Sequence, residues 1–229
     1  MGPLTPIVVV VAALTLKSDT APAKVKVNKP RGTVYWGGAG LDGPYLAPQL
    51  EAFTKAGIAH CYAGKTNTAT RSMGAVGMFI DAMRAGASIR YADDGEWTLA
   101  GMDQPADQFN LIGYSYGSLL AAQTANYYAG QGNVVNHLVL IGSPIDSAFL
   151  AKLRSNRNIK KVVVIDLRTH GDPIYAGIPQ LELAEAATTL GEQMLRNKGE
   201  GHFYYAHVTA DSKRRWAELA RRLYSEGLR

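Results

Sequence analysis

Residues 113–117 read GYSYG, which places a serine between two glycines in the pattern G-x-S-x-G. A serine hydroxyl is a weak nucleophile at neutral pH, so it needs an adjacent base, and that base needs a third group to fix its tautomer. In this pattern the serine occupies a strained turn between a strand and a helix, and the glycines leave room for backbone that approaches closely. Ser115 is therefore the predicted nucleophile of an acyl-transfer reaction. The alternative is a serine that only caps or packs in a tight turn.

Asp172 is the favoured candidate for the group that orients the base. It lies in the loop LRTHGDPIYAG, directly after the apolar run KVVVID at 161–166. The carboxyl ends of strands are where α/β sheets place groups that face a ligand. Asp166 and Asp146 are the competitors, and we expect Asp166, as the last residue of the run, to be paired structurally.

His202 is the predicted base. The chain order Ser, Asp, His requires a histidine downstream of Asp172. His202 meets this requirement in the glycine-bracketed loop KGEGHFYYAH, before the last helix-like segment. His170 is the second candidate because it flanks Asp172. The remaining histidines are interpreted as ordinary core or surface residues: His60, His137 and His207.

Attack by the serine creates an oxyanion, which backbone N–H groups must stabilise. One expected donor is the N–H of Tyr116, the residue after the nucleophile. The second is expected from the loop GGAG at 37–40, where missing side chains let amides point at a ligand. The competing interpretation of this loop is a plain turn. A phosphate-binding role of this loop is weakly supported.

The elements that must position these residues follow from the hydrophobic pattern. Apolar runs, several of them β-branched at successive positions, alternate with helix-like segments, which predicts an α/β doubly wound, mainly parallel sheet with helices on both faces. The runs are 33–38, 58–63, 109–114, 137–142 and 161–166. The helix-like segments are 45–56, 73–85, 115–129, 147–155 and 180–197.

Two pieces interrupt this alternation. Residues 88–101 have strand-like arms around the dipeptide Asp94-Gly95, which predicts a hairpin, interpreted as an inserted flap. Residues 174–200 are long for a connection. They form either a lid over the site or an ordinary crossover helix.

The N-terminal residues 1–23 contain the uncharged apolar run LTPIVVVVAALTL. This segment is interpreted either as a signal or anchor, which would make the protein secreted or attached to the cell envelope, or as an added strand of the fold. The run is short for a bilayer span. Residues 24–229 are predicted to form a single domain.

Charge and cysteine content exclude several classes of site. The single cysteine, Cys61, excludes an intramolecular disulfide and a cysteine-based metal cluster. The net charge is +5, with basic residues clustered at 24–31, 152–161 and in the amphipathic C-terminal segment. Because no nucleic-acid motif accompanies them, these residues are interpreted as solvated faces, with attraction to an anionic membrane surface as the alternative.

Together, NLIGYSYGS, the upstream YWGGAG, the HGDP loop and GEGHF resemble the α/β-hydrolase superfamily, in particular its small serine lipases and esterases. The resemblance covers about residues 32–229. It implies a triad of Ser115, Asp172 and His202, and it requires no metal or organic cofactor. Trp36 stands where many lipases carry a histidine, which leaves the second oxyanion amide open between Gly38 and Ala39.

The resulting hypothesis is a serine esterase or lipase that hydrolyses carboxylic esters, in particular lipid acyl esters, through an acyl-serine. Leu41, Tyr114 and Tyr175 are predicted to line the substrate site with apolar and aromatic walls. A phospholipase that acts on membranes, including a membrane-attacking toxin, is one form of this hypothesis. The alternatives are a thioesterase or acyltransferase that uses the same triad, and a non-catalytic binding protein with the same fold.

Overall fold

The computed structural model describes residues 30–38, 43–64 and 106–229. The N-terminal segment 1–23, the predicted helix at 73–85 and the predicted flap at 88–101 therefore lie outside the described residues.

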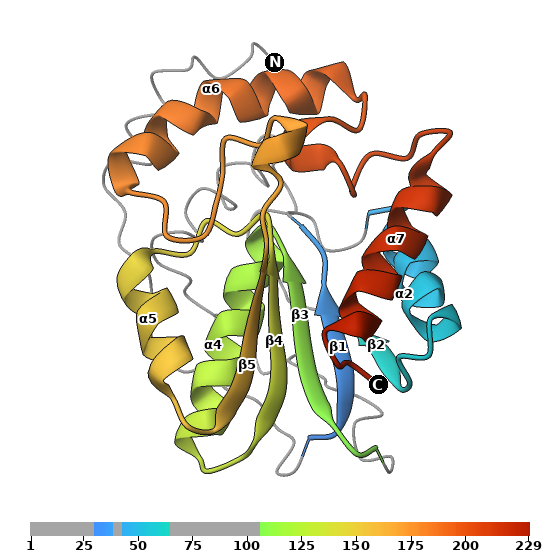
Figure 1. Ribbon diagram of the computed structural model, residues 1–229. Helices are drawn as coiled ribbons and strands as arrows, with labels where there is room; N and C mark the ends of the chain where they lie inside the picture. Colours follow the sequence, from blue (N-terminus) through green and yellow to red (C-terminus); the bar gives the residue numbers. More distant parts are fainter. Residues whose placement is uncertain (1–29, 39–42, 65–105) are drawn as a thin grey trace, which may run out of the picture.

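The centre of the fold is a parallel sheet of five described strands in the order β2-β1-β3-β4-β5 (Figure 1). The predicted parallel α/β sheet is confirmed, and each strand overlaps one of the five predicted runs. The strands are β1 (Gly32–Trp36), β2 (Cys61–Ala63), β3 (Phe109–Tyr114), β4 (Val135–Ile141) and β5 (Ile159–Ile165). The chain leaves β1 toward β2 on one side, whereas β4 and β5 lie beyond β3 on the other side. In such sheets, ligands bind at the carboxyl ends of the strands where the strand order reverses, which here is between β1 and β3.

Helices cover both faces of this sheet. Helices α4 (Tyr116–Gly130) and α5 (Ser147–Ser155) lie on one face, and α2 (Leu46–Lys55) and α7 (Ser212–Ser225) lie on the other (Figure 1). Successive strand residues belong to different cores: Leu111 and Leu138 pack toward α4, whereas Ile112 and Val139 pack toward α7. This alternation is the period of two that a strand covered on both faces requires.

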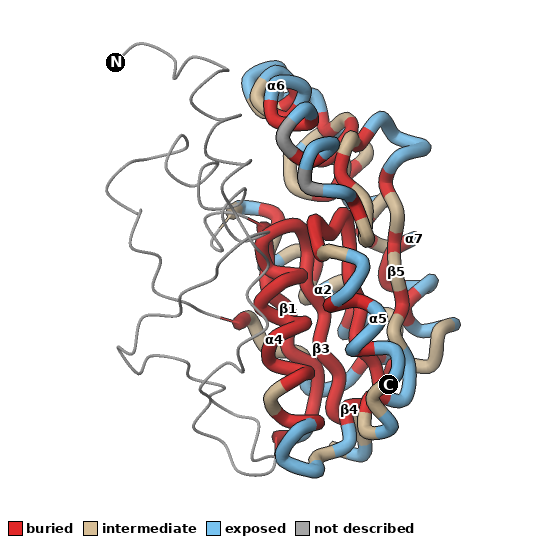
Figure 2. The backbone as a smooth tube through the Cα atoms, turned by 90° about the vertical axis from the view of Figure 1, so that its left-hand side faces the viewer, coloured by how far each residue is buried: buried red, intermediate tan, exposed pale blue. Residues whose placement is uncertain are grey.

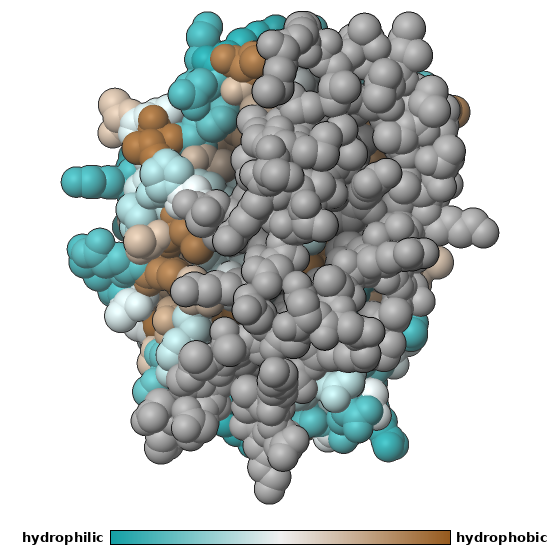
Figure 3. All heavy atoms as spheres, turned by 180° about the vertical axis from the view of Figure 1, so that it is seen from behind, coloured by the Kyte–Doolittle hydropathy of each residue, from teal (hydrophilic) through white to brown (hydrophobic). Residues whose placement is uncertain are grey.

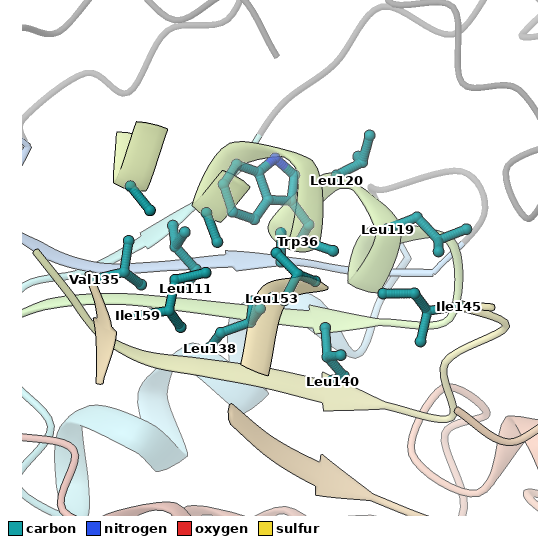
Figure 4. Close-up of a cluster of buried hydrophobic side chains, with 14 of the residues drawn as sticks. Trp36, Leu111, Leu119, Leu120, Val135, Leu138, Leu140, Ile145, Leu153 and Ile159 are labelled. Carbon is teal, nitrogen blue, oxygen red and sulfur yellow. The ribbon is translucent and has the colours of Figure 1, made fainter. Parts of the chain in front are cut away.

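Helix α4 is the central helix of the fold, and nearly all its residues are buried (Figure 2). Its side chains meet those of the sheet in the core drawn in Figure 4, where Leu120 of α4 lies with Trp36 and Leu111. Its burial extends around the whole circumference and includes polar residues such as Gln123 and Thr124. Because α4 starts directly after Ser115, this packing fixes the direction in which the serine turn leaves the sheet.

Helix α6 (Gln180–Arg196) lies across the carboxyl ends of the strands instead of along a face (Figure 1). Its inner side forms a separate small core in which Leu183 and Leu190 pack with Ile174 and Ile178. From α6 the described chain continues through the 3₁₀ turn η3 (Gly201–Phe203) to α7, with no further strand. A crossover helix joins two strands, so the crossover interpretation does not hold for α6. Its action as a lid stays a prediction.

The outer surface of the described part is that of an ordinary globular protein. Seen from behind, hydrophilic and hydrophobic side chains lie next to each other on the described portion of the face (Figure 3). The exposed large hydrophobic side chains come from two helices and two loops: Leu181 and Leu195 of α6, Tyr224 of α7, and Val134 and Val208. Single exposed hydrophobic residues of this kind are normal. Within the described ranges, no helix combines the length and apolar character needed to cross a bilayer.

Candidate catalytic site

Ser115 forms the turn between β3 and α4 with a positive φ of 54° and a ψ of −121°. A side chain other than glycine at such a φ costs about 1–3 kcal/mol, and surrounding contacts must hold it in place. The backbone N–H of Ser115 donates to the carbonyl oxygen of Ile141 at 2.8 Å, at the end of the neighbouring strand β4. The hydroxyl is thereby presented at the carboxyl edge of the sheet.

The glycines around Ser115 are required by close backbone approach. A Cβ atom at Gly113 would lie 2.2 Å from the carbonyl oxygen of Gly117. A Cβ atom at Gly117 would lie 2.2 Å from the carbonyl oxygen of Gly37, in the loop after β1. The first contact lets α4 fold back against β3, and the second brings the loop after β1 against the first turn of α4.

Replacing Gly117 with alanine is expected to lower the free energy of unfolding by about 1–3 kcal/mol, because backbone must move to admit the methyl group. Urea denaturation of the variant and the wild type measures this difference. Gly130→Ala is the matched control, because a Cβ there meets nothing within 4 Å at the end of the same helix. Its stability should equal or slightly exceed that of the wild type. Equal midpoints for the two variants would contradict the steric explanation.

His202, in η3, makes the contact with the serine. Its Nε2 lies 2.6 Å from Oγ of Ser115, and its Nδ1 lies 2.9 Å from Oδ2 of Asp172. An ionised carboxylate only accepts hydrogen bonds, so Nδ1 carries the proton and Nε2 is left to accept from the serine hydroxyl. The structure thus brings together the three side chains predicted as nucleophile, base and orienting acid.

Asp172 follows the 3₁₀ turn η2 (Arg168–His170) that begins shortly after β5. Its side chain is fully buried, and its second oxygen, Oδ1, accepts from the N–H of Ile174 at 2.8 Å. Gly142, at the end of β4, lies against both partners, because a Cβ there would be 3.1 Å from Oδ2 of Asp172 and 3.5 Å from Cε1 of His202. Both carboxylate oxygens therefore have partners in a buried place.

The competing carboxylates have other roles. Asp166 pairs with Arg168 through two side-chain contacts, and the hydrogen bond from Arg168 lowers the pKa of this carboxyl. Asp146 caps α5 by accepting from the N–H of Phe149 at 2.8 Å. The structural pairing expected for Asp166 is therefore observed.

Three of the other histidines have defined partners of their own, and His60 is exposed. The ring of His170 stacks on Tyr204 with 3.7 Å between centroids, and that of His207 stacks on Phe203 at 4.6 Å. His137 is buried, and its Nδ1 bonds with Oδ1 of Asn110 at 2.8 Å. Cys61 is partly buried, and its thiol donates to a carbonyl oxygen, while burial raises its pKa to about 11.

Two of the predicted oxyanion amides, those of Tyr116 and Gly38, lie near the serine turn. Tyr116 is the first residue of α4, so its N–H lies in the first turn of that helix, where N–H groups point out of the helix end. The N–H of Gly38 donates to the hydroxyl of Tyr45 at 2.6 Å. A substrate oxygen that binds Gly38 would have to replace this hydroxyl. Ala39, the alternative second donor, lies outside the described residues.

Of the predicted substrate-lining residues, Leu41 also lies outside the described part of the chain. Tyr114 is buried, its hydroxyl donates to the carbonyl oxygen of His202, and its ring stacks on the imidazole with 5.8 Å between centroids. The hydroxyl of Tyr175 donates to Glu182 at 2.5 Å, and Arg168 lies over its ring. Tyr114 therefore contacts His202 through both its hydroxyl and its ring. Tyr175 connects the loop after Asp172 to α6.

The three aligned side chains are shielded from solvent. Ser115 is 6% exposed, His202 is 5% exposed and Asp172 is 3% exposed. Exclusion of water strengthens each electrostatic interaction among them. Among the described residues, no group of three or more histidine, cysteine or carboxylate side chains is placed to hold a metal ion.

A comparison with known protein families finds a match. The family model for the thioesterase domain matches residues 99–213, about half of the chain, and this span includes Ser115, Asp172 and His202. The chain belongs to the thioesterase domain family. This family is part of the α/β-hydrolases, so the resemblance noted in the sequence is confirmed at that level. No curated protein and no solved structure matches the chain.

Gln193 of this thioesterase-domain site had no usable sequence signal. It accepts a hydrogen bond from the N–H of His202 and donates one to the carbonyl oxygen of Gly171, beside Asp172. In the sequence it is one polar residue of a helix-like segment, and no pattern distinguishes it. Tyr45, the partner of Gly38, does have a signal, because it follows the GGAG loop closely in the chain and is expected beside the site. Gly142 could have been found, because a glycine that ends an apolar run lies at the ligand-facing edge of a parallel sheet.

Proposed function

We propose that this protein is a serine thioesterase that hydrolyses acyl thioesters through an acyl-enzyme on Ser115. The observation that carries the proposal is the chain of contacts from Oγ of Ser115 to Nε2 of His202 at 2.6 Å and from Nδ1 to Asp172 at 2.9 Å. It lies within the span that matches the thioesterase domain. Membership of that family favours the thioesterase alternative over the lipid-ester hypothesis.

The proposed reaction has two stages. Oγ of Ser115 attacks the thioester carbonyl carbon while Nε2 of His202 takes the hydroxyl proton. The C–S bond then breaks, and the imidazolium returns that proton to the departing sulfur, leaving an acyl-serine and a free thiol. Water next attacks the acyl-serine, with His202 taking its proton and returning it to Oγ as the carboxylic acid leaves. Asp172 holds the imidazole tautomer and stabilises its charged form throughout.

Backbone amides stabilise the oxyanion in both stages. The N–H of Tyr116 is the proposed first donor, and Gly38 or Ala39 supplies the second. One such donor contributes about 3 kcal/mol to transition-state stabilisation. The hydroxyl of Tyr45, now bonded to the N–H of Gly38, occupies the place of a hydrogen-bond acceptor that the substrate oxygen would take.

A lipid ester substrate and an anionic membrane partner have weaker support. Two arginines of α7 are paired with carboxylates: Arg214 with Asp211 and Glu218, and Arg215 with Asp211. The buried face of the same helix packs in the core through Trp216 and other apolar residues. These observations favour a solvated basic face. Phospholipid hydrolysis is therefore an outcome to be tested and is not the proposed activity.

A matched pair of substrates tests the proposal. An acyl-CoA and the p-nitrophenyl ester of the same acyl group share the acyl-serine, so they differ only in the leaving group and its recognition. We expect kcat/KM for the thioester to exceed that for the oxygen ester by at least about tenfold, or 1.4 kcal/mol. Phosphatidylcholine vesicles with the same acyl chain are the third arm. Hydrolysis of oxygen esters or phospholipid without thioester turnover would restore the esterase and lipase hypothesis.

Product analysis separates hydrolysis from acyl transfer, which passes through the same intermediate. The assay is repeated with glycerol or an amine added as acceptor, and the acyl products are identified by mass spectrometry. Free acid as the main product supports the thioesterase. A dominant transfer product would instead identify an acyltransferase.

A further inference from the structure

Both backbone polar groups of His202 are held by side chains from other elements. Its N–H donates to Oε1 of Gln193 at 2.9 Å, and its carbonyl oxygen accepts from the hydroxyl of Tyr114. Gln193 comes from α6, whereas Tyr114 is the last residue of β3, directly before Ser115. The position of the imidazole is therefore set by contacts outside its own loop.

The same amide of Gln193 also holds the loop that carries Asp172. Its Nε2 donates to the carbonyl oxygen of Gly171 at 2.8 Å, one residue before the acid. Gln193 is 6% exposed, its hydrogen bond with the His202 N–H is buried, and its hydrogen bond to the carbonyl oxygen of the exposed Gly171 is partly buried. One side chain thus bridges the loop of the acid and the loop of the base.

Gly201 makes room for this bridge. A Cβ atom at Gly201 would lie 2.2 Å from the Gln193 side-chain amide, and the residue has a φ of +56°. The amide of Gln193 therefore fills the space that a side chain beside His202 would take. This packing explains why glycine precedes the histidine, independently of the hydrogen bonds.

The two loops that Gln193 joins also contact each other through the stacked rings of His170 and Tyr204, and the loop of the base contacts β3 through Tyr114. Asp172 and His202 are 30 residues apart, and their direct contact is the 2.9 Å hydrogen bond between Oδ2 and Nδ1. Catalytic side chains must be held within fractions of an ångström of the productive geometry, which requires support from surrounding hydrogen bonds. Tyr114 fixes His202 relative to Ser115, and Gln193 fixes it relative to Asp172. Burial raises the pKa of Tyr114 well above its ordinary value, so its hydroxyl stays protonated and keeps donating.

We propose that Gln193 is a positioning residue, which sets the distance between Asp172 and His202 by bridging the Gly171 carbonyl and the His202 N–H. The proposal rests on the proposed function, because the alignment matters for rate only if Ser115 and His202 react with substrate. Helix α6 then has a second role besides covering the carboxyl edge of the sheet. It fixes the position of the loop that carries Asp172 relative to the loop that carries His202.

Gln193→Met tests the proposal, because methionine has a similar length and forms neither hydrogen bond. We expect kcat to fall about 10- to 100-fold while KM changes less than about threefold, since misplacement by about 1 Å can cost 100-fold in rate. The matched control is Glu192→Met, an adjacent exposed residue of α6 that is paired only with Arg196 among the contacts of the described structure. This control should keep the kcat of the wild type.

A readout other than turnover separates positioning from a general loss of stability. The proton between Nδ1 of His202 and Asp172 gives a downfield proton NMR signal when the hydrogen bond is formed. In Gln193→Met we expect this signal to broaden or move, and the His202 amide to exchange with solvent faster, at a temperature where circular dichroism shows a folded protein. A second variant, Gln193→Glu, keeps the shape and the acceptor for His202 but, when ionised, cannot donate to Gly171. We expect it also to lower kcat.

Wild-type kcat together with an unchanged NMR signal in Gln193→Met overturns the proposal. If that variant does not fold, wild-type kcat and an unchanged signal in Gln193→Glu overturn it instead. The proposed function is tested separately by the wild type, since thioester turnover that persists in Ser115→Ala would refute the acyl-serine mechanism whatever the Gln193 variants do. A disturbed NMR signal in an otherwise inactive protein would still support the bridge.

Discussion

Ser115→Ala is expected to reduce thioester turnover by a factor of about 10⁴ to 10⁶. The substitution removes the only atom that forms the covalent intermediate, and members of a triad act as a unit, so little of the rate remains when one is removed. Residual hydrolysis over the rate in water would come from the oxyanion amides and from binding. The fold should persist, because Oγ of Ser115 has one described side-chain partner, Nε2 of His202, and alanine leaves the backbone bond to Ile141 in place.

Initial rates with the acyl-CoA substrate measure this loss, and labelling with a fluorophosphonate followed by mass spectrometry locates the reactive residue. Ser155→Ala is the matched control, because Ser155 is an exposed serine at the end of α5. It should keep full activity and full labelling at Ser115. Folded wild-type protein that neither reacts with the probe nor turns over substrate would favour the non-catalytic binding protein.

Much of the fold could be predicted because short-range patterns determine it. The runs at 109–114 and 137–142 are apolar at successive positions, as strands covered on both faces require, and they form β3 and most of β4. Helix α5 has the predicted bounds 147–155, since Asp146 caps its start. The candidate nucleophile and acid each come after a strand, β3 and β5, so their position at the carboxyl edge could be expected.

What could not be predicted depends on contacts between distant segments. The pattern of α6 is that of any amphipathic helix, and nothing in it indicates that the helix crosses the carboxyl edge of the sheet. Its Gln193 contacts residues 9 and 22 positions away through backbone atoms, which leave no trace in residue types. Tyr114 was expected to face substrate, but its hydroxyl and ring both contact His202.

The sequence also does not indicate the leaving group of the substrate. Oxygen esters and thioesters give the same acyl-serine, so the residues that perform the chemistry do not distinguish them. Apolar and aromatic residues near a site suit an acyl chain on either substrate. The lipid-ester hypothesis rested on such residues, and the family match, which covers the whole set Ser115, Asp172 and His202, is what favours thioesters.

His202→Ala is expected to reduce turnover by a factor of about 10⁴ to 10⁶, similar to the loss in Ser115→Ala. Without the imidazole, the proton of Ser115 has no acceptor at 2.6 Å and the leaving thiol has no proton donor. Unlike the serine variant, this one should also lose about 1–3 kcal/mol of stability, because Oδ2 of the fully buried Asp172 loses its hydrogen-bond donor. Initial rates and urea denaturation of the same preparation measure the two effects.

His170→Ala and His207→Ala discriminate among the histidines downstream of the nucleophile. The ring of His170 stacks on Tyr204, and that of His207 stacks on Phe203, so their removal should change turnover by less than about threefold. The double variant Ser115→Ala with His202→Ala should be scarcely less active than either single variant, because the two residues act in one step. An active His202→Ala beside an inactive His170→Ala would move the base to residue 170. Since Asp172 would then have to release His202 and pair with a residue of its own loop, that result would also require an active conformation different from the one described.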